Sequence, residues 1–223
     1  MGYQVLATDY DGTLAKDGVI DEETIAMLQT AKDAGICIVL VTGRLLETLL
    51  EVCDHFELFD LAVVENGAVL YDPKTKKERP LAELPPPKYV ETLRSRGIDR
   101  LEVGRVIVST WRPHDQTMLE TIRDLRLDRQ MIFNKDAVMS LPTEITKATG
   151  LEAALKELGY SFEQTIAIGD AENDLHFMQT CALSVAVANA LERVKEQADL
   201  VLDAARGAGV CVLIQKLLAN EIL

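Results

Sequence analysis

The chain has 223 residues, of which 48% are hydrophobic, and its formal net charge at pH 7 is −13. This length allows one large domain or two small ones with a substantial core. The acidic balance argues against a nucleic-acid partner, which would need a basic face, and it is compatible with an ordinary enzyme.

No apolar stretch reaches membrane-spanning length, and the N-terminus lacks a charged region followed by a long apolar one. We therefore expect a cytoplasmic protein with no membrane partner. The cysteines are widely spaced among apolar residues, so we expect small core residues and neither a disulfide set nor a zinc site. They are Cys37, Cys53, Cys181 and Cys211.

The first predicted strand ends in two acids. The apolar run from Tyr3 to Ala7 has the length of a buried strand, and Asp9, Asp11 and Gly12 follow it. Aspartate and glycine are also ordinary turn residues, so a solvated turn is the alternative interpretation. In open α/β sheets, however, ligands bind beyond the carboxyl ends of the strands. Two acids at such an edge are hard to explain as packing.

Helices and strands then alternate as far as residue 80. Asp21 is a good N-cap, and two near-continuous apolar runs have the character of strands covered on both faces. The predicted elements are a helix over 21–35, a strand over 36–41 ending at Thr42-Gly43-Arg44, a helix over 45–53, a strand over 61–64 ending at Glu65-Asn66-Gly67, and a hairpin of 68–71 with 77–80.

The alternation breaks at Leu84-Pro85-Pro86-Pro87, because prolines cannot continue a helix or a central strand. We expect a small α+β cap domain over 84–142, inserted into a core formed by 1–83 and 143–223. Inside the insertion, the pattern predicts helices over 88–96 and 116–125 and strands over 102–110, 131–133 and 137–141.

After the insertion the alternation resumes. The pattern predicts helices over 146–158, 191–197 and 209–219, and strands over 165–169, 183–187 and 200–202. The strand over 165–169 is followed by Asp170 and Asp174. Alternating strands and helices define the fold class as α/β, with a Rossmann-like parallel sheet as the core.

Polar groups at several strand ends converge if these strands are neighbours in one sheet. The groups are Asp9, Asp11, Thr42, Asp170 and Asp174, with Lys147 opening the helix after the insertion. Four carboxylates would repel one another without a cation. Mg²⁺ prefers oxygen ligands and usually binds carboxylates together with substrate phosphate oxygens. An aspartate can attack phosphorus, and a second carboxyl group can serve as acid and then as base.

These motifs together resemble the haloacid dehalogenase-like superfamily, in its phosphatase branch and its Cof-type or sugar-phosphatase subgroup. The matching stretches, in order, are Asp9-x-Asp11-Gly12-Thr13, Val41-Thr42-Gly43-Arg44, Lys147, and Gly169-Asp170-x-x-Asn173-Asp174. Glu65-Asn66-Gly67-Ala68 and Val187-Ala188-Asn189-Ala190 also resemble that subgroup. One departure is that Ala148 follows Lys147 where the family often has glycine, so Lys135 is the fallback lysine.

The resemblance implies a Mg²⁺-dependent phosphatase that hydrolyses a small phosphorylated metabolite, such as a sugar phosphate or a phosphoglycolate-like ester. It implies that Asp9 is the nucleophile and Asp11 the general acid/base. Phosphate would bind Thr42, Gly43 and Lys147. The metal ligands would be Asp9, the backbone carbonyl of Asp11, Asp170 and, directly or through water, Asp174.

Several residues are weaker candidates for substrate contact. Arg44 is predicted to bind either a distal anion of the substrate or only solvent, and Asn66 is either a turn residue or a substrate contact. The remaining candidates are Asn173 and the cap-loop residues Trp111, Arg112 and His114, for which surface decoration is the alternative. Competing hypotheses are a phosphotransferase or mutase on the same scaffold, a response-regulator-like phosphoacceptor domain, and a catalytically silent metabolite sensor. The length of the chain and the predicted nucleophile after the first strand argue against the phosphoacceptor domain, and Asp11 argues against the silent sensor.

Overall fold

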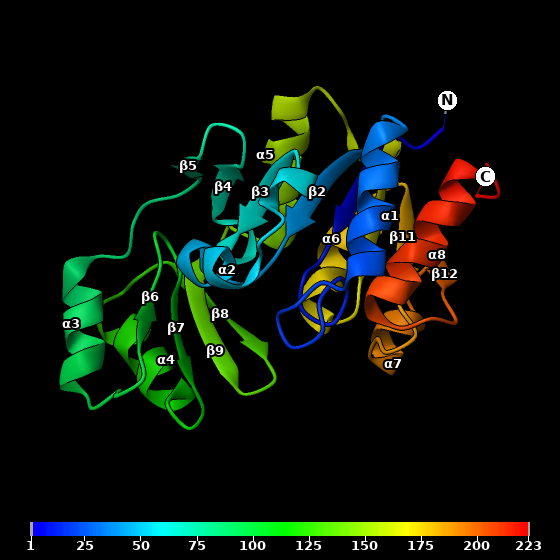
Figure 1. The fold of residues 1–223 in the computed structure, drawn as a ribbon. Coiled ribbons are helices and arrows are strands. Elements are labelled where there is room, and N and C mark those ends of the chain that lie inside the picture. Colours follow the sequence, from blue (N-terminus) through cyan, green and yellow to red (C-terminus); the bar gives the residue numbers. More distant parts are fainter. Residues whose placement is uncertain (1, 223) are drawn as a thin grey trace.

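The computed structural model describes residues 2–222, and its main element is an eight-stranded sheet in the order β12-β11-β10-β1-β2-β3-β4-β5 (Figure 1). The pairs from β12 to β3 are parallel, and β4 and β5 are antiparallel additions. The strands are β1 (Val5–Thr8), β2 (Cys37–Val41), β3 (Leu61–Val64), β4 (Val69–Asp72), β5 (Lys77–Pro80), β10 (Thr165–Gly169), β11 (Leu183–Ala186) and β12 (Leu200–Val201).

Helices cover both faces of this sheet, which explains why every residue of β1, β2, β3 and β10 is buried. In Figure 1, α1 and α8 lie side by side in front of the sheet, and α5 and α6 lie behind it. The helices that accompany the large sheet are α1 (Glu22–Asp33), α2 (Leu46–Val52), α5 (Lys147–Leu158), α6 (Leu175–Thr180), α7 (Glu192–Lys195) and α8 (Arg206–Leu218). The predicted α/β class with a parallel core is confirmed.

A second sheet of four antiparallel strands has the order β6-β7-β9-β8, and we call it the cap sheet. Its strands are β6 (Glu102–Val103), β7 (Val108–Trp111), β8 (Arg129–Asn134) and β9 (Ala137–Pro142), and its helices are α3 (Pro87–Ser95) and α4 (Asp115–Asp124). These helices and one face of the sheet share a separate hydrophobic cluster that includes Tyr89, Leu93, Val108, Met118 and Val138. The domain bounds 84–142 remain a prediction.

One predicted strand is wrong. The sequence pattern predicts a single strand over 102–110, but the structure has a tight β6–β7 hairpin. The turn is closed by the Gly104 N–H, which donates to the Ile107 carbonyl at 2.9 Å. The backbone N–H groups of residues 105–107 donate to the carboxylate of Glu65, which is distant in the chain. These N–H groups therefore do not pair with a neighbouring strand, as they would in the predicted strand.

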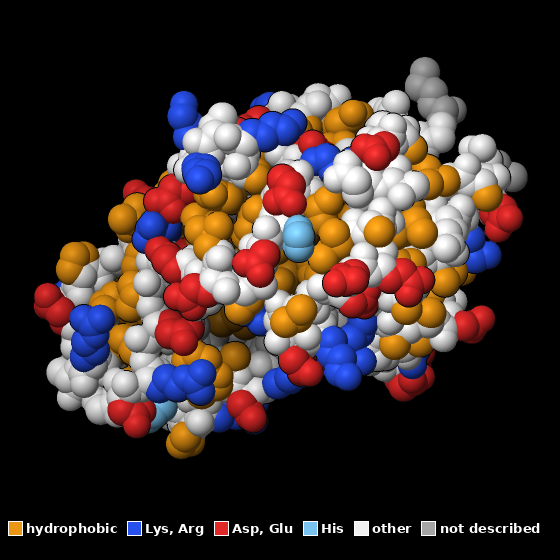
Figure 2. All heavy atoms as spheres, in the orientation of Figure 1, with side chains coloured by type: hydrophobic (Ala, Val, Ile, Leu, Met, Phe, Trp, Pro, Cys, Tyr) orange, Lys and Arg blue, Asp and Glu red, His pale blue; other side chains and the backbone are white. Residues whose placement is uncertain are grey.

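Acidic and basic side chains are interspersed over the face drawn in Figure 2, and the described residues on that face form no basic stripe. Within residues 2–222, no helix combines the length and apolarity needed to cross a membrane. The described cysteines are all free thiols, and Cys37, Cys53 and Cys211 are buried.

Candidate active site

Three neighbouring strands end at the same edge of the large sheet. β1 lies between β10 and β2 in parallel register, so Asp9, Thr42 and Asp170 follow directly at adjacent strand ends. These three residues line a cavity of about 210 Å³, and the cap sheet forms the opposite wall of this cavity. The core side of the lining includes Asp9, Asp11, Thr42, Gly43, Arg44, Lys147, Asp170 and Asn173, and the cap side includes Glu102, Ser109, Trp111, Asn134 and Met139.

The floor of the cavity holds a buried ionic cluster. Carboxylate oxygens of Asp9, Asp170 and Asp174 lie within 4.8 Å of one another. The Lys147 ammonium donates to Asp9 Oδ1 and to Asp174 Oδ1, each at 2.6 Å. Lys147 is only 4% exposed and Asp174 is fully buried, so these contacts are shielded from solvent. Buried charged pairs of this kind persist only when they are well hydrogen-bonded.

The pKa values of the clustered groups are consistent with a cation that binds beside Lys147. Burial and the nearby Asp174 raise the pKa of Asp9, against the lowering effect of Lys147. Burial and Asp174 also raise the pKa of Asp170 to about 6. Burial disfavours charged Lys147, yet Asp174 and Asp9 outweigh it and raise the pKa of the ammonium. Burial is the main cause of both raised carboxyl pKa values, and repulsion from Asp174 adds to it. Clustered oxygen donors at this spacing suit a hard divalent ion.

Two glycines let the acids approach. Gly12 has φ of +90°, and a Cβ there would lie 2.4 Å from Asp170 Oδ2. A Cβ on Gly169 would lie 2.7 Å from the Asp174 Cβ. Asp174 Oδ2 accepts from the backbone N–H groups of Asp170 and Ala171, at 3.1 and 3.0 Å. Asp174 therefore holds both Lys147 and the loop that carries Asp170.

Asp11 lies outside this cluster and is paired with Arg44. The Arg44 guanidinium donates to Asp11 through Nε at 2.6 Å and through Nη2 at 2.7 Å, and it lies 5.5 Å from the centre of the Tyr10 ring. Neither sequence-based interpretation of Arg44 included this partner. The signal that could have found it is the position of both residues just after neighbouring strands, within reach of an arginine fork.

The structure separates the weaker candidates. Trp111 and Asn173 line the cavity, and Arg100 stacks on the Trp111 ring with 3.2 Å from its guanidinium carbon to the ring centre. Arg112 instead lies over Phe133, and His114 Nε2 is 3.1 Å from Asp99 Oδ1. Arg112 and His114 therefore make contacts within the cap, and neither residue lines the cavity.

Asn66 lies behind the cavity wall. It is buried, and its side-chain amide donates to the Met139 sulfur at 3.0 Å. A Cβ on Gly43 would lie 3.1 Å from Asn66 Oδ1. Asn66 therefore packs between the loop after β2 and the cap sheet.

The cap-side lining was missed by sequence reasoning, apart from Trp111. Residues two apart on a strand point to the same face, so Ser109 and Trp111 share the face toward the cavity, while Val108 lies in the apolar cluster beneath α3 and α4. Glu102 pairs directly with Ser109 across the β6–β7 ladder. This alternation was available in the sequence, but the mistaken single strand over 102–110 concealed the pairing.

Comparison with known proteins agrees with this architecture. A family model described as haloacid dehalogenase-like hydrolase matches residues 6–93 and 88–214. The chain is 30% identical to a phosphoglycolate phosphatase from Methanothermobacter thermautotrophicus over 222 residues, which covers 96% of this chain and 98% of the relative. It is 26% identical to the 5-amino-6-(5-phospho-D-ribitylamino)uracil phosphatase YcsE of Bacillus subtilis, covering 95% and 94%.

Among solved structures, a haloacid dehalogenase-like hydrolase from Bacteroides thetaiotaomicron aligns with a TM-score of 0.81 at 20% identity, covering 96% of this chain and 99% of that one. At this level of identity the alignment supports the fold. The sheet, the strand-end site and the family match together define a hydrolase with a parallel-sheet core. The chain belongs to the haloacid dehalogenase-like hydrolase family.

Proposed function

We propose that this hydrolase is a Mg²⁺-dependent phosphatase that removes the phosphoryl group of a small phosphorylated metabolite through a phosphoryl-Asp9 intermediate. The observation that carries the proposal is the buried contact of Lys147 with Asp9 and Asp174, beside Asp170, at the floor of a cavity. Such a site offers a nucleophile, an anion-binding ammonium and carboxylate ligands for a cation.

Asp9 and Asp170 are the residues we propose as carboxylate ligands of Mg²⁺, together with the backbone carbonyl of Asp11. Both oxygens of Asp174 already accept hydrogen bonds, so we place Asp174 behind these ligands, where it orients Lys147 and acts on the ion through water. The ion would neutralise charge between the carboxylates and the phosphate, which otherwise repel.

In the first half-reaction, an Asp9 oxygen forms a bond to phosphorus while the ester P–O bond breaks. The leaving oxygen takes a proton from Asp11. Lys147, the Thr42 hydroxyl and backbone N–H groups at Gly43 bind the phosphoryl oxygens as charge redistributes. Because Arg44 holds both Asp11 oxygens in this structure, Asp11 must exchange that partner for the leaving group.

In the second half-reaction, water attacks the phosphorus of phosphoryl-Asp9 and gives its proton to the Asp11 carboxylate. The bond between phosphorus and Asp9 breaks, which releases inorganic phosphate and restores both aspartates. The same carboxyl group thus donates one proton and accepts another in each cycle, so no net proton is left on the protein.

The substrate class follows from the size of the cavity and from the relatives. About 210 Å³ is below the roughly 300–1,000 Å³ of sites for drug-sized ligands, which favours a small leaving group. The two relatives named above act on phosphoglycolate and on a phosphoribitylamino-uracil, both phosphate monoesters. We propose a metabolite of that size, a sugar phosphate or a phosphoglycolate-like ester.

Hydrolysis of p-nitrophenyl phosphate tests the proposal. We expect turnover with Mg²⁺, loss of turnover in EDTA, and recovery when Mg²⁺ is restored. Asp9→Asn should abolish turnover, and Asp11→Asn should lose turnover while still binding inorganic phosphate. Full activity of Asp9→Asn would refute the phosphoryl-Asp9 route. A protein phosphorylated once without turnover would instead point to a response-regulator-like phosphoacceptor.

A further inference from the structure

The segment after β3 contacts both sheets. The Glu65 N–H donates to the Arg44 carbonyl at 2.9 Å, and the Asn66 N–H donates to the Thr42 carbonyl at 3.0 Å. The backbone of this segment is therefore bonded to the loop after β2, which lines the cavity. Unlike the polar residues after β1, β2 and β10, Glu65 does not line the cavity.

The Glu65 carboxylate binds the turn between β6 and β7. Its Oε1 accepts the Arg105 N–H at 2.8 Å, and its Oε2 accepts the N–H groups of Val106 and Ile107 at 2.9 and 3.0 Å. Glu65 is 0% exposed, so these bonds do not compete with water. A buried carboxylate with several backbone donors is a strong and directional anchor.

The surroundings of Glu65 leave it little freedom. Glu65 has φ of +54°, a left-handed conformation that non-glycine residues adopt at a cost and that often marks a functional position. A Cβ on Gly104 would lie 2.5 Å from Glu65 Oε1. The absence of a side chain at Gly104 is what admits the carboxylate to the turn.

The anchored turn leads directly into the roof of the cavity. β7 begins directly after Ile107. Ser109 and Trp111 lie on this strand, and both line the cavity. The next residue of the anchoring segment, Asn66, contacts Met139 on β9, which also lines it. The turn that leads into β7 and the neighbouring strand β9 are thus both bonded to the segment after β3.

Other contacts of the same turn are exposed. The Arg105 guanidinium lies 2.7 Å from a Glu47 oxygen and 2.8 Å from a Glu78 oxygen, and all three side chains are at least a third exposed. Exposed ion pairs contribute little, because solvent and salt screen them. The buried Glu65 bonds therefore dominate the attachment of this turn.

We propose that Glu65 is a positioning residue that fixes the cap sheet onto the loop after β2, so that the cap stays docked throughout the catalytic cycle. The roof residues Ser109 and Trp111 then keep a constant height above Asp9 and set the leaving groups that fit. The kinetic part of this inference rests on the proposed phosphatase function, whereas the docking itself does not.

Amide hydrogen exchange tests the docking without any activity. In the wild-type chain, the amides of residues 105–107 should exchange slowly, at a rate similar to that of the hydrogen-bonded amides within the cap sheet. In Glu65→Gln and in Gly104→Ala they should exchange at least about tenfold faster, with β1 and β10 unchanged. Glu78→Gln is the matched control, because it removes only an exposed partner of Arg105, and it should leave the exchange unchanged. Fast exchange of these amides in the wild-type chain would overturn the proposal.

Steady-state kinetics then separate positioning from general destabilisation. At a temperature well below unfolding, KM for p-nitrophenyl phosphate should rise about tenfold in Glu65→Gln and Gly104→Ala, because misplaced contacts weaken binding of the leaving group. The inhibition constant of inorganic phosphate should stay within about twofold, because the groups proposed to bind phosphate, Thr42, Gly43 and Lys147, all belong to the core. If both constants rise together, or neither changes, the inference is wrong.

If the wild-type chain has no phosphatase activity, the proposed function fails while the exchange result still decides the docking. Gly104→Ala carries both tests if Glu65→Gln does not fold.

Discussion

At the scale of single residues, the charge balance of the site depends on Lys147. Its ammonium is the group that contacts both Asp9 and Asp174, and all three side chains are nearly or fully buried. Removing one member of a buried ion pair leaves the others uncompensated, which typically costs about 3–5 kcal/mol. The site should therefore affect stability as well as chemistry.

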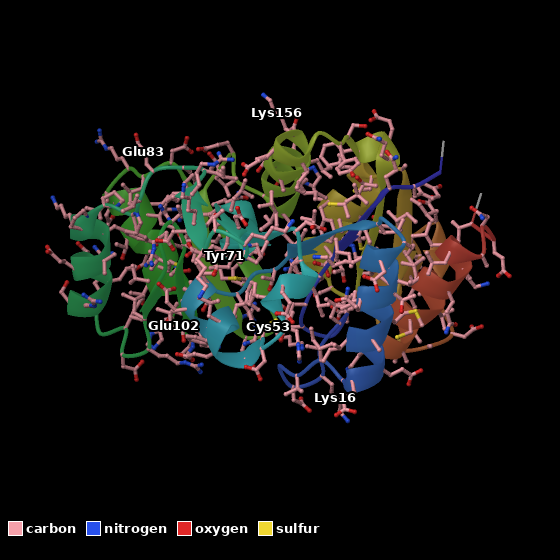
Figure 3. All side chains as sticks on the ribbon, turned by 45° about the horizontal axis from the view of Figure 1, so that its top comes forward. Lys16, Cys53, Tyr71, Glu83, Glu102 and Lys156 are labelled. Carbon is pink, nitrogen blue, oxygen red and sulfur yellow. The ribbon has the colours of Figure 1, made fainter. Side chains whose placement is uncertain are left out.

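We expect Lys147→Met to lower the free energy of unfolding by about 3 kcal/mol in EDTA, and Mg²⁺ to restore part of the loss. Urea unfolding with and without Mg²⁺ measures both effects. Lys156→Met is the matched control, because Lys156 lies on the same helix, is exposed, and points away from the protein (Figure 3). Equal losses in the two variants would contradict the role given to the buried ammonium.

The pH dependence of metal binding follows from Asp170. Its pKa is raised to about 6 from an ordinary 3.8, so the folded chain retains a proton that the unfolded chain has already lost. Without metal, this group makes the folded state less stable as the pH rises from about 4 to about 6. Mg²⁺ competes with that proton, so its stabilising effect should grow over the same window.

We therefore expect Mg²⁺ to raise the thermal unfolding midpoint more at pH 7.5 than at pH 5. The apparent affinity should fall at least about tenfold for each pH unit below about 6, because the pKa of the other carboxylate ligand, Asp9, is raised as well. Thermal shift titrations at several pH values give this dependence, and Asp170→Asn should make it less steep. A Mg²⁺ effect that stays constant from pH 5 to 7.5 would argue against Asp170 as a ligand.

The strand-end pattern predicted from sequence that Asp9, Thr42, Asp170 and Lys147 converge, and the structure brings them together. Asp11 and Arg44 also follow neighbouring strands, which brings them within reach of each other, but position alone does not specify which partner a long arginine side chain binds. Glu65 was visible as the end of a strand and as part of a stretch that resembles the family. Its contacts were not predictable, since its partners lie about 40 residues further along the chain.

At the scale of elements, the first turn of α5 delivers Lys147 to the site. The Thr146 hydroxyl accepts the Thr149 N–H at 3.2 Å, and the Thr149 hydroxyl accepts the Thr146 N–H at 2.9 Å. This capping box satisfies backbone donors that would otherwise lack partners at the helix start. It also fixes the backbone of the residue just before Lys147.

Thr146→Ala should lower the free energy of unfolding by about 1 kcal/mol, the usual cost of losing such a cap. Chemical denaturation provides the measurement. For comparison, Thr30→Ala removes an exposed mid-helix hydroxyl that donates to the Ala26 carbonyl, and we expect a change within about 0.5 kcal/mol. If the two substitutions cost the same, the capping box does not hold the start of α5.

Elements with local signals were predictable, and elements shaped by distant contacts were not. The apolar runs of β1, β2, β3 and β10 identify buried strands because both of their faces are covered. The apolar residues of 102–110 gave the same signal, yet the segment folds back at Gly104. Its turn depends on a carboxylate supplied by the segment after β3, which no local pattern contains.

At the scale of the whole molecule, the cavity lies where two sheets of different kinds meet. The large sheet presents strand ends with acids, α5 adds Lys147, and the cap sheet presents a face of polar and apolar side chains above them. The groups that we propose for the chemistry lie on the core side, and those that we propose to distinguish one leaving group from another lie on the cap side. The parallel core was predictable from the alternation of elements, whereas the cap-side lining required the correct strand pairing.

Mapping the phosphoryl group tests the central claim most directly. Asp11→Asn should form phosphoryl-Asp9 normally from p-nitrophenyl phosphate, whose leaving group needs no acid, and hydrolyse it slowly for want of a base. Acid quenching followed by peptide mass spectrometry should find one phosphoryl group on the peptide that contains Asp9, and none in Asp9→Asn. A phosphoryl group on another residue, or turnover with no covalent intermediate at any quench time, would contradict the account.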